Sequence, residues 1–193
     1  MGSYWWGVVG SYLHLLGMAA YLGGSLIMEF VVGPAQSAIP PAQAQVMGQK
    51  TADKFLVVVW SSLGLLLASG VVQAFYKGTQ RMVLLGNGWF SSSYGWTQFL
   101  MIVLWMVLVI NGLIMTFVLR PKLAGKMSAQ VGAQQVQAKQ QEMLKAARLI
   151  TRITRIDLGI ALFLPLAGAG LIRGAGLFTG TALSNLTALT GLF

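Results

Sequence analysis

The chain has 193 residues, of which 56% are hydrophobic and only 9% are charged, and its formal net charge at pH 7 is +9. Because a typical soluble domain carries roughly a quarter charged residues, this composition excludes an ordinary soluble fold and indicates an integral membrane protein. The absence of cysteine excludes disulfides, thiolate metal sites, iron–sulfur clusters and covalently attached c-type haem.

Four apolar segments are long enough to cross a bilayer, which takes about 20 residues of helix. They lie at about residues 5–33, 55–75, 96–119 and 153–172. We therefore expect one all-α membrane domain over residues 1–193, built as a bundle of four transmembrane helices.

The basic residues predict the orientation of this bundle. Ten of the thirteen lysines and arginines lie in two segments, between the first and second spans and between the third and fourth. The other side of the membrane holds only Lys77, Arg81 and Arg173. The positive-inside rule then places both termini outside the cytoplasm. The positive charge thus indicates topology and contact with anionic lipids, and we expect no nucleic-acid partner.

Two segments outside the spans carry further expectations. The stretch "KMSAQVGAQQVQAKQQEMLKAARLITRITRID", residues 126–157, has no proline and spaces its apolar residues in a loosely helical pattern. It predicts an extended cytoplasmic helix that continues into the fourth span. The uncharged tail 174–193 is rich in Gly and Thr, which favours an interfacial segment or packing against a neighbouring subunit.

The first and third spans end in similar sequences. Residues 26–34 read "LIMEFVVGP" and residues 113–121 read "LIMTFVLRP", identical at six of nine positions. The pattern indicates two repeated helical hairpins, related by a pseudo-two-fold axis along the membrane normal. His14 and Met101 each lie twenty residues before the matched proline, so both are expected roughly 30 Å above the cytoplasmic ends, near the outer leaflet.

Glu29, Asp157 and Asn111 are polar residues in or near the spans. A carboxylate in a membrane is a functional candidate by default. Glu29 and Asp157 nevertheless lie close to basic residues, so we expect both to be paired in structural roles: Glu29 with Lys50, Lys54 or Arg120, and Asp157 beside Arg152, Arg155 and Lys54. Asn111 is expected to form an interhelical hydrogen bond.

His14 is the one histidine of the chain. Its helical neighbours at i−4, i−3, i+3 and i+4 are Gly10, Ser11, Gly17 and Met18, small enough in three cases to let a flat ring approach the backbone. This pattern is compatible with axial ligation of a b-type haem. The alternative is a neutral imidazole hydrogen-bonded to a neighbouring helix, with the glycines serving helix packing.

The chain also resembles a superfamily of small bacterial membrane proteins. The resemblance rests on His14 followed by Gly23 and Gly24, a proline after the first helix, and "ASG" at 68–70 in the second. The superfamily includes copper-resistance D-type membrane domains, uncharacterised predicted integral membrane proteins and four-helix protoporphyrinogen oxidases. In the oxidases the histidine matching His14 is associated with haem, and a lysine on the third helix is important. Gln98 stands near that position here, which argues against oxidase activity.

We therefore predict a haem b protein of the bacterial inner membrane, acting in electron transfer as a small subunit with other membrane subunits or a redox partner. The haem would lie between the first and third helices. Met101 is the preferred second iron ligand, since the repeat places it opposite His14, whereas Met18 lies on the same helix as His14. A cofactor-free structural subunit and a copper-handling or other transport protein are the alternatives.

Overall fold

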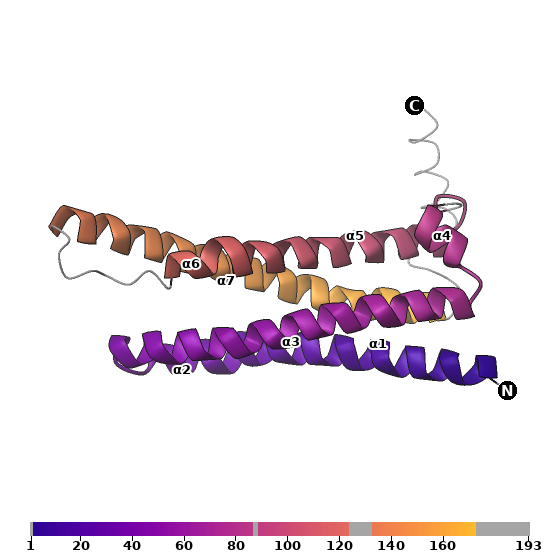
Figure 1. Cartoon of the computed structure of the whole chain (residues 1–193), viewed down its shortest axis with the longest axis horizontal. Coiled ribbons are helices and arrows are strands. Elements are labelled where there is room, and N and C mark those ends of the chain that lie inside the picture. Colours follow the sequence, from indigo (N-terminus) through magenta and orange to yellow (C-terminus); the bar gives the residue numbers. More distant parts are fainter. Residues whose placement is uncertain (1, 87–88, 124–132, 173–193) are drawn as a thin grey trace, which may run out of the picture.

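The computed structural model describes residues 2–86, 89–123 and 133–172, and this part of the chain is helical with no strand (Figure 1). Its elements in chain order are α1 (Gly2–Ile27), η1 (Met28–Val32), α2 (Gly33–Ser37), α3 (Pro41–Tyr76), α4 (Gln80–Leu85), α5 (Ser93–Leu113), η2 (Ile114–Leu119), α6 (Arg120–Leu123) and α7 (Ala133–Ile172), where η1 and η2 are π-helical. The expected all-α class is confirmed. The predicted tail 174–193 lies outside the described residues.

Three helical stretches of the described chain are long and apolar enough to cross a membrane: Tyr4–Ser37, Val46–Tyr76 and Ser93–Leu119. They correspond to the first three predicted spans. The fourth predicted span forms the C-terminal part of α7, which is not among the three. The expected continuity is present, since α7 is a single helix from Ala133 to Ile172.

Local sequence accounts for where the long helices begin and end. α3 begins with Pro41, whose fixed φ suits the first turn of a helix. Just past its end, Gly78 adopts a positive φ of 70°, a conformation that glycine reaches without steric cost. The Ser92 hydroxyl accepts a hydrogen bond from the Gly95 amide at 3.1 Å and caps the start of α5.

The long helices form two antiparallel hairpins, α1 with α3 and α5 with α7 (Figure 1). Because α1 and α5 each lie beside both α3 and α7, the first and third predicted spans face each other across the bundle. The N-terminus and α4 lie at one end of the bundle, whereas α2, α6 and the beginning of α7 lie at the other.

The bundle is apolar inside and outside. Its central core contains the buried side chains of Leu63, Leu108 and Leu164. Large apolar side chains such as Leu15, Phe30 and Phe117 are exposed on the outer surface. Exposed apolar surface on this scale is unfavourable in water and suits contact with lipid.

Glycines of α1 bring α3 close along much of the first hairpin. Gly10, Gly17 and Gly24 recur every seven residues. A Cβ atom would lie 3.1 Å from Val72 Cγ1 at Gly10, and at Gly17 it would lie 3.2 Å from both Leu66 Cγ and the Ser62 carbonyl oxygen. Because glycine has no side chain, α1 and α3 can pack at short range at these positions.

Candidate functional site

His14 lies at the interface of α1 and α3, between Gly10 and Gly17 of α1. Its Nδ1 atom is 2.9 Å from the hydroxyl oxygen of Ser69, a residue of α3 that is only 2% exposed. The Ser69 hydroxyl itself donates to the carbonyl oxygen of Leu65 at 2.6 Å, one turn earlier in α3. Gly70 is the next neighbour, since a Cβ added there would lie 3.9 Å from His14 Cε1.

These contacts favour one ring nitrogen of His14 as the protonated one. A serine hydroxyl has one hydrogen, and that of Ser69 is directed to a backbone carbonyl, so its oxygen accepts from His14. His14 Nδ1 is then the protonated nitrogen, and Nε2 keeps its lone pair. A histidine that binds a metal through one nitrogen commonly donates a hydrogen bond from the other, so His14 has the protonation state of a metal ligand.

The other predicted site residues have separate positions. Gly10 and Gly17 face α3, so helix packing accounts for them in this structure. Ser11 is exposed, and Met18 is buried in the central core. Met101, on α5, packs against that core and lies close to Gly168 of α7. His14 therefore contacts α3, whereas Met101 contacts α7.

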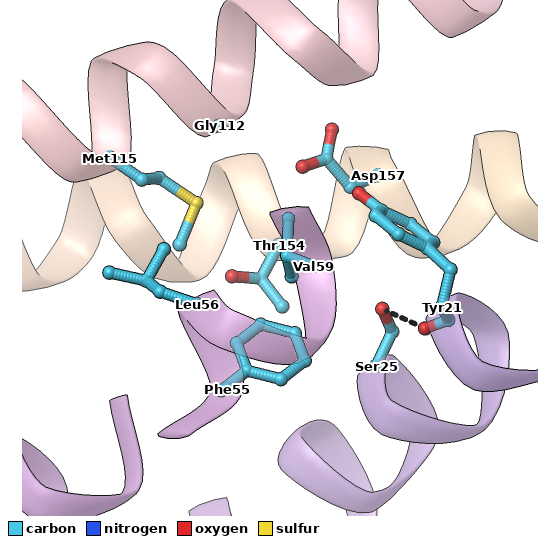
Figure 2. Close-up of a pocket in the computed structure, with 9 residues that line it drawn as sticks. All are labelled: Tyr21, Ser25, Phe55, Leu56, Val59, Gly112, Met115, Thr154 and Asp157. Carbon is cyan, nitrogen blue, oxygen red and sulfur yellow. Dashed lines mark hydrogen bonds between the residues drawn. The ribbon is translucent and has the colours of Figure 1, made fainter. Parts of the chain in front are cut away.

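A second polar site surrounds Asp157. Asp157 was expected to lie beside basic residues; instead it points into the bundle and is only 6% exposed. Asn111 of α5 donates a hydrogen bond from Nδ2 to Asp157 Oδ1 at 2.7 Å, which confirms the expected interhelical role of Asn111. The Tyr21 side chain of α1 points at the same carboxyl group and interacts with it (Figure 2).

A small cavity adjoins this carboxyl group. Its volume is about 10 Å³, close to the space that one water molecule needs. All four long helical stretches contribute to its lining, which consists of Tyr21, Ser25, Phe55, Leu56, Val59, Gly112, Met115, Thr154 and Asp157 (Figure 2). The polar side chains on it are thus held between apolar ones.

Ion pairs connect the helices at the end of the bundle where α2 and α6 lie. Glu29 accepts a hydrogen bond from Arg155 Nε at 2.8 Å, and Asp53 pairs with Arg120. The expectation that Glu29 is paired is confirmed, but its partner comes from α7 and is none of the three basic residues expected. The helical register that joins Glu29 to Arg155 depends on tertiary packing, and no local sequence signal marks it.

No family model, curated protein or solved structure matches this chain.

Proposed function

We propose that this protein binds haem b through His14 and acts in electron transfer in the bacterial inner membrane, as a small subunit of a larger redox assembly. The observation that carries the proposal is the hydrogen bond between His14 Nδ1 and Ser69, because Nε2 keeps a lone pair when Nδ1 is the donor. Bound haem would supply reversible one-electron chemistry at its iron, which no side chain near His14 provides.

The proposed haem ligand is identified by the Nε2 lone pair of His14 and not by the glycines beside it. His14 fits an axial ligand, since Ser69 contacts its ring at Nδ1 and not at Nε2. Gly10 and Gly17 give the haem no separate support, because α3 occupies the space beside them. The role of the chain is then to orient the imidazole and to keep water away from it with the apolar helices.

Met101 remains the preferred second ligand within this proposal, and the repeat supports it. The π-helical segments η1 and η2 lie in the matched sequences 26–34 and 113–121. His14 faces Ser69 and Gly70 of α3 in its hairpin, and Met101 faces Gly168 of α7 in the other. The two residues thus have similar places in two similar hairpins, and a methionine ligand would raise the reduction potential relative to a second histidine.

The proposal includes four spans with both termini outside the cytoplasm. The end of the bundle with α2, α6 and the start of α7 carries the basic Arg120 and Arg155, and the N-terminus lies at the opposite end. The C-terminal part of α7 packs through Ala161 and Leu164 into the same core as the three apolar helices, which supports its inclusion as a fourth span.

The test is an absorption spectrum of the full-length protein purified in detergent after expression with haem supplied. The wild type should show a Soret band, and His14→Ala should abolish it because no other histidine can replace the ligand. Met101→Leu should retain the haem with a shifted spectrum and a lower reduction potential. Met18→Leu, at a buried methionine of α1, serves as the control and should leave both unchanged.

Stoichiometric haem in the His14→Ala protein would contradict the proposal, as would a wild type without a Soret band under these conditions. The second of these outcomes would favour a cofactor-free structural subunit. Two observations support that alternative. The hydrogen bond between His14 and Ser69 also joins two helices, and the glycines of α1 face α3.

A further inference from the structure

The Asp157 site lies inside the apolar part of the bundle. Tyr21, which points at Asp157, precedes Glu29 by eight residues, or roughly 12 Å of helix, so its hydroxyl lies well inside the first span. Asn111 precedes Arg120 by nine residues in the third. Asp157 is therefore held at a depth where lipid surrounds the bundle and water is scarce.

No basic side chain neutralises this carboxyl group among the described residues that face it. α1 contributes Tyr21, α5 contributes the uncharged Asn111, and α3 contributes the apolar Leu56 and Val59 to the cavity. On α7 itself, Arg155 is directed to Glu29 instead. A single buried carboxylate without a cation costs several kcal/mol, more than two hydrogen bonds of ordinary strength return.

Binding of a proton removes this cost without any further ligand. A metal cation such as Na⁺ would need several oxygen ligands, whereas the cavity has room for about one water molecule and is lined mainly by apolar side chains. We propose that Asp157 is an intramembrane proton-binding site, held by Asn111 and Tyr21 and supplied with protons through the adjoining cavity. This inference is independent of haem binding.

The cavity lies on one side of Asp157. Ser25, Phe55, Met115 and Thr154 line it, and each is nearer than Tyr21, Asn111 or Asp157 to the end where the ion pairs lie. A proton from water at that end would reach the carboxylate oxygen that does not accept from Asn111. Loss of the proton returns it to water in the cavity. We therefore expect the site to exchange protons with that end of the bundle, the predicted cytoplasmic side.

Infrared difference spectroscopy of the full-length protein in lipid nanodiscs tests this proposal. The chain has only four acidic side chains, so the carboxyl region of the spectrum is simple. We expect the band of a protonated carboxyl group to persist as the pH is raised past the range, about 4, in which an aspartic acid in water ionises. The band should be lost in Asp157→Asn and retained in Asp53→Asn, which removes an exposed acid.

Two further measurements distinguish a proton site from a merely structural carboxyl group. Tyr21→Phe should shift the frequency of the band without abolishing it, because a hydrogen-bonding partner is lost while the acid remains. Transfer to D₂O should shift the band in the wild type, because the cavity admits water. A wild-type spectrum identical to that of Asp157→Asn at all pH values would overturn the proposal, and a band that does not respond to D₂O would overturn the access route.

Discussion

At the scale of single residues, His14 and Asp157 are polar groups held in different ways between the helices. His14 Nδ1 is hydrogen-bonded to the Ser69 hydroxyl group, which donates to the carbonyl oxygen of Leu65. Asp157 instead accepts from Asn111 and remains without a cation among the described residues. A neutral hydrogen-bonded ring stabilises the interface of α1 and α3, whereas a lone carboxylate gains stability only by changing its charge.

Ser69→Ala tests the residue-scale interpretation of His14 without any cofactor. It removes the oxygen that accepts from Nδ1 and leaves a partly buried N–H without a partner, so the free energy of unfolding should fall by about 1–3 kcal/mol. Ser61→Ala, at an exposed serine of the same helix, should change it by less than about 0.5 kcal/mol. Denaturation in mixed detergent micelles measures both, and equal effects of the two substitutions would argue against a specific role for Ser69.

At the scale of elements, the first hairpin depends on close contact between backbones. Van der Waals contact and hydrogen bonds drive helix association in lipid, because lipid tails offer no hydrophobic driving force between helices. Gly17 contributes to this contact, since the Ser62 carbonyl oxygen and the Leu66 side chain lie directly beside it. The π-helical η1 and η2 lie in the similar sequences 26–34 and 113–121, near the ion-paired end.

Gly17→Ala should therefore weaken the hairpin. Its Cβ would lie 3.2 Å from a backbone oxygen that cannot rotate away, so α1 and α3 would have to move apart, at a cost of about 1–3 kcal/mol. Gly23→Ala is the matched control, because nothing lies within 4 Å of the added methyl group. The control should be neutral or stabilise by up to about 1 kcal/mol, since alanine favours helix more than glycine. Thermal unfolding in detergent compares the two, and a neutral Gly17→Ala would contradict the close packing.

At the scale of the whole molecule, charge and apolarity are distributed in different ways. Apolar side chains cover the outer surface along the length of the bundle, which suits a lipid environment. The ion pairs of Glu29 with Arg155 and Asp53 with Arg120 gather at one end, opposite the N-terminus and α4. The positive-inside rule predicts that the ion-paired end, which carries Arg120 and Arg155, faces the cytoplasm.

Cysteine labelling tests that orientation, and the absence of native cysteine makes each single variant unambiguous. Lys50→Cys and Lys77→Cys place a thiol near opposite ends of α3, both at exposed positions. A membrane-impermeant maleimide added to intact cells should label Lys77→Cys, and Lys50→Cys only after the membrane is opened. Labelling of both variants from the outside would exclude the proposed topology.

The sequence by itself determined the all-α class, the three helices long and apolar enough to cross a membrane, and the continuity of α7, because hydropathy and helical spacing are local properties. It also indicated that Asn111 bonds another helix and that Glu29 is paired. Only the tertiary structure decided which partners meet: Ser69 for His14, Gly168 for Met101, Arg155 for Glu29, and Asn111 with Tyr21 for Asp157. The physical reason is that a contact between helices depends on the rotation of each helix about its axis and on their register, which the packing of all four helical stretches sets together.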